Sequence, residues 1–407
     1  AVYKGKSPAL LKIRTHSGRE FKVTPIHKLL TFSDLKEIKV EAQSLKKGDY
    51  LIIPRALPEI KEKRKELPWQ EIFKDFRVVE PNILKEFHKI LEELKNRYGT
   101  LKKVARNLNL EYDCLMGYWI KKNLPPLKIL TRAYKLAGKN MPLVCYLKGE
   151  KNSKPIAIPH TFNEKLALFI GLLAGDGQVK GRSIRFYNND FEIQNLFKRL
   201  AREVFNADVK KYKMKTIEVL IIESPVIKEA LNYFGFPEYK KSKNICLPKG
   251  ILNTGEKVLL QFLCGYFICD GHFNRKKGEI EITTSSQGLF SGFGYLLAFL
   301  GIGASFRKRR PGKNESWRIF IRGKEEIKKL WNPGYVEVGK IKQIGEYLKD
   351  MRKTYNSWDI VPLSKSFIND IYQSVGRPYK RWKTGGLEIF NYLSGENMGR
   401  KIFQKFA

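Results

Sequence analysis

The chain has 407 residues and a formal net charge of +36. A chain this basic usually has a polyanion as its partner, and nucleic acid is the first candidate. It contains no apolar run of membrane-spanning length and no signal peptide, and its five cysteines lack zinc-ligand spacing. We therefore expect an intracellular, cytoplasmic prokaryotic protein of two to four domains that does not contact a membrane.

Residues 1–57 read as β-rich, with a hairpin over 10–15 and 21–24 and a further short strand at 50–54. The stretch 23–30, which contains Thr24 and His27, resembles the TxxH block of intein splicing domains. Residues 47–51 fit the lysine, glycine and aspartate turn of the same family. The resemblance implies part of a Hint splicing domain, in which Thr24 and His27 polarise the peptide at the N-terminal splice junction. The alternative is a threonine and a histidine that only cap a turn.

The ends of the given chain lead to an expectation about splicing. Inteins of this family begin with a cysteine or serine nucleophile and end with asparagine, whereas this chain begins at Ala1 and ends at Ala407. We therefore expect that the chain, taken as an internal fragment or a decayed intein, does not splice.

Residues 58–152 form a charged and mostly helical insert. The apolar spacing predicts helices over 81–97, 101–108, 111–122 and 127–137, with Thr100 as an N-cap. The second and third of these resemble a helix-turn-helix, whose second helix would enter the major groove of DNA with Lys121 and Lys122 exposed. The alternative is an ordinary three-helix bundle that makes no DNA contact.

Two similar stretches, 169–177 and 263–271, are separated by the length of one small domain. Each is an apolar run with small residues four positions apart, so that these residues share one helix face and allow close helix packing. Each ends in Asp-Gly, which predicts a helix that is capped by its last glycine and carries Asp176 or Asp270 at its negative end. Two such ends packed together would crowd two carboxylates, and a divalent cation is the natural compensation.

These stretches resemble the paired LAGLIDADG motifs of homing endonucleases, in the form found inside inteins. The resemblance implies an α+β fold, a duplicated αββαββα core that is saddle-shaped with pseudo-two-fold symmetry, and activity as a monomer. We place this core at 153–335, with repeats at about 160–250 and 256–335. The alternative is two core helices with incidental terminal aspartates.

The predicted elements after each motif repeat in the same order. A strand, a helix, a basic hairpin and a helix follow the first motif at 183–187, 191–205, 208–223 and up to 234. Equivalent elements follow the second motif at 279–284, 288–300 and 304–322. Basic side chains of these segments are predicted to contact DNA, arginine reading guanine and lysine following phosphates. They are Arg182, Arg185, Lys210, Lys211, Lys213, Lys215, Arg307, Lys308, Arg309, Arg310, Lys313, Arg318 and Arg322.

The resemblance also implies a lysine that assists at the reacting phosphate. Lys243 matches the family's lysine-bearing block best, with Lys241 as the alternative. No corresponding lysine of the second copy is evident in the sequence.

Residues 336–407 have no repeat partner and are predicted to be a helical extension. A helix starts near 363–368, and Trp382, Phe390, Phe403 and Phe406 would supply a small core. Residues 24–30, 376–379 and 391–398 together resemble inteins lodged in archaeal A/V-type ATPase catalytic subunits.

The predicted function is that of an intein-encoded endonuclease that makes a Mg²⁺-dependent staggered double-strand cut in a long asymmetric DNA site. The resemblance implies that Asp176 and Asp270, with their preceding residues Gly175 and Cys269, hold the metal. One alternative is a DNA-binding regulator with a LAGLIDADG-like core, a helix-turn-helix and no catalysis. Another is a splicing or structural remnant without nuclease activity.

Overall fold

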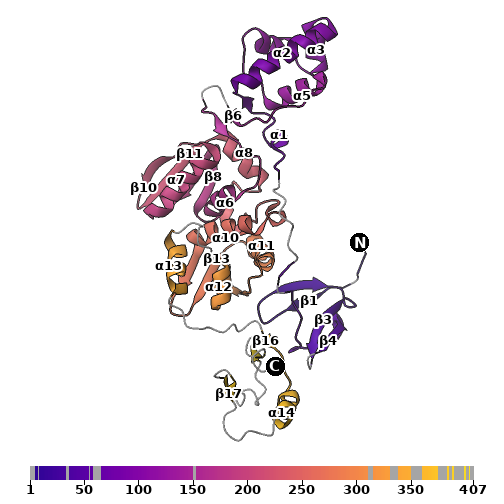
Figure 1. The fold of residues 1–407 in the computed structure, drawn as a ribbon, viewed down its shortest axis with the longest axis vertical. Helices are drawn as coiled ribbons and strands as arrows, with labels where there is room; N and C mark the ends of the chain where they lie inside the picture. Colours follow the sequence, from indigo (N-terminus) through magenta and orange to yellow (C-terminus); the bar gives the residue numbers. More distant parts are fainter. Residues whose placement is uncertain are drawn as a thin grey trace.

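The computed structural model describes residues 5–7, 9–33, 36–54, 56–57, 66–149, 153–309, 315–330, 338–349, 360–374, 383–384, 387–388, 398–399 and 403. Figure 1 shows the helical insert at the top, two α/β repeats stacked below it, and the small β-hairpins of the N-terminal region beside the lower repeat. None of the helices in the described ranges combines the length and the apolar character that a membrane span requires.

The N-terminal region consists of two antiparallel hairpins. The first, β1 (Leu11–Arg14) with β2 (Glu20–Val23), confirms the predicted pair of strands. The second, β3 (Lys28–Ser33) with β4 (Lys36–Glu41), was not predicted. The strand expected at 50–54 is reduced to a single bridge between Leu51 and Thr31.

The insert contains the predicted helices. They are α2 (Pro81–Tyr98), α3 (Leu101–Asn107), α4 (Tyr112–Trp119) and α5 (Leu127–Ala137). The Thr100 hydroxyl accepts from the Lys103 amide at 3.3 Å, as expected of an N-cap. The third predicted helix ends at Trp119 rather than Lys122, whose φ of +49° lies outside the helical region. The short helix α1 (Trp69–Ile72) and a small sheet of β5 (Arg77–Val78), β6 (Tyr146–Lys148) and β7 (Ile156–Ala157) lead to the core.

The core is built twice from the same elements. The first repeat comprises α6 (Glu164–Asp176), β8 (Gly177–Lys180), β9 (Ser183–Tyr187), α7 (Phe191–Phe205), β10 (Lys210–Met214), β11 (Ile217–Glu223) and α8 (Pro225–Tyr233). The second comprises α10 (Glu256–Asp270), β12 (Gly271–Asn274), β13 (Glu279–Thr284), α11 (Gln287–Phe299), β14 (Ser305–Arg309), β15 (Ser316–Arg322) and α12 (Lys324–Leu330). The strand orders, β8-β9-β11-β10 and β12-β13-β15-β14, are identical. This confirms the duplicated α+β fold.

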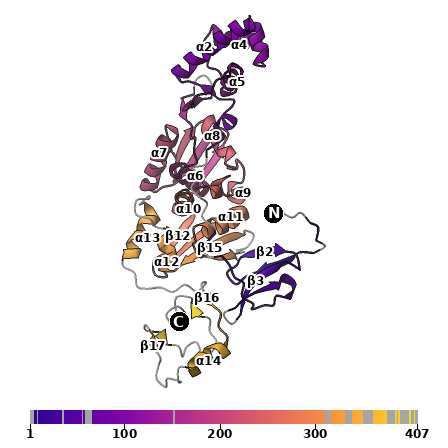
Figure 2. The ribbon, with the colours of Figure 1, turned by 45° about the vertical axis from the view of Figure 1, so that its right-hand side comes forward.

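The two motif helices, α6 and α10, lie side by side between the sheets (Figure 2). A Cβ atom on Gly265 would lie 2.6 Å from the carbonyl oxygen of Leu168, and one on Gly171 would collide with the backbone of Phe262. Glycine at these positions therefore lets the two helix backbones touch, as the spacing predicted.

The glycines that follow the aspartates cap the two helices, as predicted, because the Gly177 amide donates to the Leu173 carbonyl and the Gly271 amide to the Phe267 carbonyl. Their backbone is extended rather than left-handed. Gly177 and Gly271 have φ near −95° with ψ of 164° and begin the next strand. They are glycine because the strand doubles back on its own helix. A Cβ on Gly177 would lie 2.5 Å from the Leu173 carbonyl oxygen, and one on Gly271 would meet the Phe267 ring.

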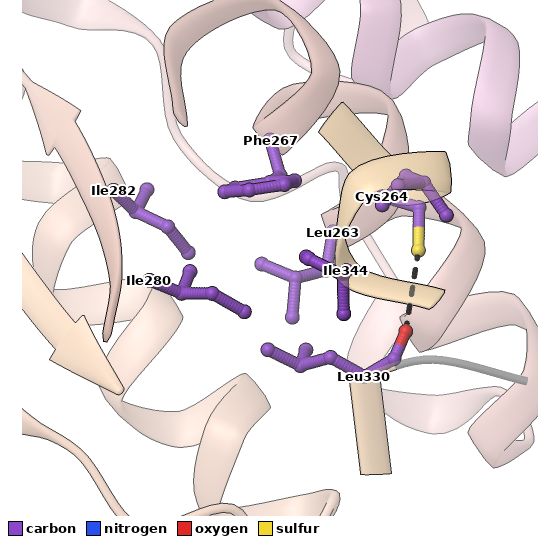
Figure 3. A pocket seen from close by; sticks show the side chains of 8 residues that line it. Leu263, Cys264, Phe267, Ile280, Ile282, Leu330 and Ile344 are labelled. Carbon is purple, nitrogen blue, oxygen red and sulfur yellow. Dashed lines mark hydrogen bonds between the residues drawn. The ribbon is translucent and has the colours of Figure 1, made fainter. Parts of the chain in front are cut away.

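The core of the second repeat is closed by α13 (Gly339–Lys349), a helix that lies within the predicted helical extension at 336–407. Together with α10 and the sheet it encloses a small apolar pocket (Figure 3). The pocket is lined by Leu263, Cys264, Phe267, Ile280, Ile282, Leu330, Ile341 and Ile344. Burial raises the pKa of the Cys264 thiol to about 12, so this cysteine acts as a small core residue.

The turn of the first hairpin packs against β14, the edge strand of the second repeat's sheet. The Phe306 amide donates to the Ser17 carbonyl at 2.6 Å, and the Arg19 guanidinium lies 5.4 Å from the centre of the Phe306 ring. Gly18, at φ +84°, has no room for a Cβ against the Phe306 carbonyl. The N-terminal region is thereby joined to the duplicated core.

The predicted C-terminal helix is present as α14 (Lys365–Ser374). Short strand pairs, β16 (Ile360–Val361) with β19 (Met398–Gly399) and β17 (Lys383–Thr384) with β18 (Leu387–Glu388), accompany it. Of the aromatic residues expected to form a small core here, Trp382, Phe390 and Phe406 lie outside the described residues.

Candidate functional site

The carboxylates of Asp176 and Asp270 end the two paired helices. The Asn188 amide donates to Asp176 Oδ2 at 2.8 Å and fixes that carboxylate. The pKa of Asp270 is raised, first by burial and then by the negative charge of Asp176. The Asp176 carboxylate therefore lies close enough to Asp270 to disfavour the charge of Asp270.

Lys241, on the short helix α9 (Lys241–Asn244), lies against the end of the first motif helix. Its ammonium group donates to the Ala174 carbonyl at 2.8 Å and also to the Gly175 carbonyl. Burial lowers the pKa of Lys241, while the nearby Asp270 and Asp176 act in the opposite direction. Lys243, which fitted the family pattern best, is exposed on the same helix. The structure thus brings Lys241 to the carboxylates.

Lys340, at the start of α13, has the same relation to the second motif helix. Its ammonium group donates to the carbonyls of Ile268 and Cys269, both at 3.0 Å. In each repeat the lysine binds the carbonyl just before the aspartate, and it follows a residue with positive φ, Lys240 at +47° or Gly339 at +52°.

Sequence reasoning missed Lys340, although a signal was present. Residues 241–245 read Lys-Ser-Lys-Asn-Ile, and residues 340–344 read Lys-Ile-Lys-Gln-Ile. The shared pattern of two lysines, an amide and an isoleucine would have paired the two segments and indicated the first lysine of each.

The donor atoms at these helix ends suit a hard divalent cation. The two carboxylates and the carbonyl oxygens of Gly175 and Cys269 lie at the ends of the paired helices, and each of these carbonyls already accepts a hydrogen bond from a lysine ammonium group. No group of three or more histidine, cysteine or acidic side chains that could hold a metal occurs in the described part of the chain. A bound ion would therefore need the backbone oxygens as well as the carboxylates.

The thiol of Cys269 is not suited to be one of these donors. It points to the Leu172 carbonyl, with Sγ 3.6 Å from that oxygen. Burial, and then the charge of Asp176, raise the pKa of Cys269 well above its usual value, so the thiol stays protonated. The carbonyl of Cys269 accepts from the Lys340 ammonium group.

The strand pairing divides the predicted DNA-contacting residues between the two faces of each sheet. In the second repeat Arg307 lies opposite Arg318 across the strands, and both are on the face away from α11 together with Arg309 and Arg322. In the first repeat Arg185 and Lys210 lie on the corresponding face, each opposite Ile221. Lys211, Lys213 and Lys308 alternate to the other side.

Carboxylates on neighbouring strands pair with several of these basic residues, which the sequence reading did not anticipate. The pairs are Lys211–Glu218 at 2.8 Å, Lys308–Glu315 at 2.9 Å, Arg318–Glu281 at 2.9 Å and Arg322–Glu279. Arg182 and Lys215 are exposed in the turns of their hairpins. Arg310 and Lys313 lie outside the described residues.

The two helices of the predicted helix-turn-helix, α3 and α4, are consecutive and joined by a short turn. The turn between α3 and α4 contains Asn109 at φ +55°, and Lys121 and Lys122 are exposed just after α4. Tyr112 and Ile120 at the two ends of α4 also face solvent. The ring nitrogens of His88 on α2 lie 2.8 Å from the Leu84 carbonyl and 3.0 Å from the Tyr118 carbonyl, which ties α4 to α2.

The two residues of the splicing block lie in one turn. The His27 amide donates to the Thr24 carbonyl at 3.0 Å, and the His27 side chain is exposed. The turn therefore keeps both side chains in one region, between β2 and β3.

Two family models match the chain. The intein splicing domain matches residues 1–234, and the LAGLIDADG-like domain matches residues 257–332. The second match covers α10 and the rest of the second repeat.

Several archaeal proteins are similar in sequence. An A-type ATP synthase subunit of Pyrococcus abyssi is 32% identical over 100% of this chain and 31% of its own length. A probable translation initiation factor IF-2 of Methanocaldococcus jannaschii is 26% identical, and the match covers 86% of this chain and 28% of that protein. Elongation factor 2 of Methanopyrus kandleri is 25% identical, and the match covers 91% of this chain and 29% of that protein. The chain thus spans about a third of the length of these relatives.

Solved structures resemble the chain weakly. Mesophilic variants of the homing endonuclease I-DmoI have a TM-score of 0.34 at 14% identity, covering 42% of this chain and 94% of theirs. DUF199/WhiA from Thermatoga maritima also scores 0.34 at 15% identity, covering 53% and 68%.

Proposed function

The chain belongs to the intein family whose splicing-domain model it matches, and from this premise we propose that its duplicated part is a homing endonuclease. It would make a staggered double-strand cut in a long DNA site. The proposal is carried by one observation. Asp176 and Asp270 lie at the ends of the two paired helices, and a lysine ammonium group binds the backbone of each helix end. Two unequal repeats in one chain suit a monomer acting on an asymmetric site.

The mechanism assigns each group a part. Asp176, Asp270 and the carbonyls of Gly175 and Cys269 would hold Mg²⁺, which supplies a Lewis acid for the scissile phosphate and lowers the pKa of the attacking water. Asn188 keeps the Asp176 carboxylate in place through its 2.8 Å bond.

Lys241 and Lys340 would stabilise the negative charge that develops on the transferring phosphate. Each ammonium group is held by a carbonyl near the end of one motif helix, so that each repeat would be equipped to cut one strand. We assign this role to Lys241 rather than Lys243 because only Lys241 reaches the helix end.

DNA would lie across the faces of the two sheets that carry Arg185, Lys210, Arg307 and Arg309. These basic side chains would bind phosphates directly. Arg318 and Arg322 would first have to break their ion pairs with Glu281 and Glu279. The insert would add contacts through α4 and through Lys121 and Lys122.

The names of the relatives support a mobile element. A similar segment occurs in an ATP synthase protein, an initiation factor and an elongation factor, and it fills about a third of each. A segment shared by proteins with unrelated names is expected of an intein inserted into different hosts. The relative that covers the whole chain indicates an A-type ATP synthase gene as the first substrate to test.

The test is a cleavage assay with Mg²⁺ on an intein-free copy of that archaeal A-type ATP synthase gene, beside a randomised plasmid library. We expect one defined double-strand cut that is absent in EDTA and in Asp176→Asn. Tight binding without any cut would instead support a DNA-binding regulator that uses the helix-turn-helix-like insert.

A further inference from the structure

The segment that follows each repeat crosses to the other repeat. We name residues 240–247 the first strap and residues 338–344 the second strap. Each strap carries the lysine that binds its own repeat's motif helix, Lys241 on α6 and Lys340 on α10. The Ile245 carbonyl of the first strap and the Gly339 amide of the second strap, however, bond to the opposite repeat.

The first strap is anchored on α11 of the second repeat. The Ser286 hydroxyl is buried and donates to the Ile245 carbonyl at 2.5 Å. Gly288 and Gly292 on the same helix make room for the strap, since a Cβ on either would lie 2.5 Å from Cys246 Sγ or Leu247 Cγ. Three successive residues of the strap therefore fit against one helix of the other repeat.

The second strap is anchored on α7 of the first repeat. The Gly339 amide donates to Glu192 Oε2 at 3.4 Å, and the Ile193 side chain lies 3.8 Å from the position of a Gly339 Cβ. Gly339 directly precedes Lys340, so the anchor is one residue from the ammonium-bearing side chain. The rest of the second strap packs on its own repeat, where Ile341 and Ile344 line the apolar pocket, so its contact with the first repeat is confined to Gly339.

We propose that each repeat positions the lysine of the other: Ser286 in the second repeat positions Lys241, and Glu192 in the first repeat positions Lys340. This rests on the proposed function, because it gives the two strand cuts a physical link. A structural change in one repeat displaces the lysine that binds the motif helix of the other repeat. The rate of each strand cut therefore depends on both repeats.

The first experiment measures lysine accessibility without DNA or metal. An amine-acylating reagent is applied and the modification of each lysine is quantified by peptide mass spectrometry. Lys243, exposed on α9, serves as the internal reference. Ser286→Ala should raise the labelling of Lys241 several-fold and leave Lys340 unchanged, whereas Glu192→Ala should do the reverse. Ser286→Thr, which keeps the hydroxyl, should restore protection.

Matched controls separate positioning from general loosening. Ser224→Ala removes another buried N-cap hydroxyl, that of α8, and Glu203→Ala removes another α7 carboxylate, which pairs with Lys165. Neither control should expose Lys241 or Lys340. The proposal is overturned if the controls expose them equally, or if Ser286→Ala and Glu192→Ala leave both lysines protected.

A second experiment resolves the two strands during cleavage. Lys241→Met and Lys340→Met define which strand each lysine serves. Ser286→Ala should slow the same strand as Lys241→Met, and Glu192→Ala the same strand as Lys340→Met, by between about tenfold and a hundredfold. If Ser286→Ala instead slowed the strand that Lys340→Met slows, or Glu192→Ala the strand that Lys241→Met slows, the crossed arrangement would be refuted. A wild-type chain that cuts nothing would refute the proposed function, while the labelling result would still decide the positions of the lysines.

Discussion

Gly175 and Cys269 face each other at the point where the two motif helices meet, so closely that a Cβ on Gly175 would collide with that of Cys269. Each of these residues directly precedes an aspartate. The close approach therefore forces two carboxylates and two carbonyl groups into one small region at the negative ends of two helix dipoles. The first predictions test this region.

Replacing either aspartate by asparagine should abolish double-strand cleavage and leave DNA affinity nearly unchanged. The change removes a charge that would hold Mg²⁺ but not the basic surface that would hold phosphates. Cleavage is followed on labelled duplex, and affinity is measured in Ca²⁺. An Asp270→Asn variant that cuts both strands at the wild-type rate would exclude these carboxylates from catalysis.

Lys241→Met should slow cleavage by about a hundredfold or more, because a preorganised charge at the reacting phosphate is lost. Lys243→Met, on the same short helix but exposed, is the matched control and should retain nearly full activity. Single-turnover rates with saturating Mg²⁺ make the comparison. The reverse order of the two rates would return the role to Lys243.

Gly265→Ala should destabilise the fold by about 1–3 kcal/mol, since the new methyl group would lie 2.6 Å from the backbone of Leu168 on the facing helix. Gly294→Ala is the control. It is also in a helix, but its Cβ would meet only the Phe306 ring at 3.7 Å, so higher helix propensity should stabilise it by about 0.5–1 kcal/mol. Denaturant unfolding measures both, and equal effects would contradict the tight α6–α10 contact.

The affinity for DNA should fall steeply with salt. Removing one lysine that contacts phosphate lowers the slope of log K against log salt by about 1. Lys210→Ala, on the open face of the first repeat's sheet, should show this change. Lys211→Ala, which also breaks a pair with Glu218 on the other side, should show little. Similar slopes for the two variants would mean that the faces of the sheet are not distinguished by DNA.

Without metal, the stability of the protein should depend on the protonation of Asp270. Its pKa is raised in the folded chain by burial and by Asp176, so the folded state favours the neutral acid. The stabilisation that the neutral Asp270 side chain gives to the folded state is fully present below the ordinary carboxyl pKa of about 3.9. It is lost as the pH rises through the raised pKa. In EDTA, Asp270→Asn should therefore gain in Tm over the wild type as the pH rises through that window. Parallel Tm profiles would show that the carboxylate is not disfavoured.

The sequence was sufficient for the features that depend on local patterns. The motif helices followed from the spacing of small residues, the α3 cap from Thr100, and the repeat from matching element order. The strands β8 and β12 were not placed because each has only four residues and starts at the glycine that we took for a helix cap.

The site was predicted in part. Asp176 and Asp270 follow from the motif, but the lysines depend on tertiary structure. Lys241 and Lys340 each bind a carbonyl that lies more than sixty residues earlier in the chain, and such contacts leave no local periodicity. The same holds for Glu279 and Glu281, whose pairing with arginines on the next strand follows from the register of β13 against β15.

The contact between the N-terminal hairpin and Phe306 has a consequence for how such a protein can evolve. The Ser17 carbonyl accepts a hydrogen bond from the Phe306 amide of the edge strand β14, and the Arg19 guanidinium lies over the Phe306 ring. A chain trimmed to its two repeats would expose an open strand edge beside an aromatic side chain, which is a typical start of aggregation. Selection against aggregation alone would therefore preserve the hairpin, even in a lineage that no longer needs to splice.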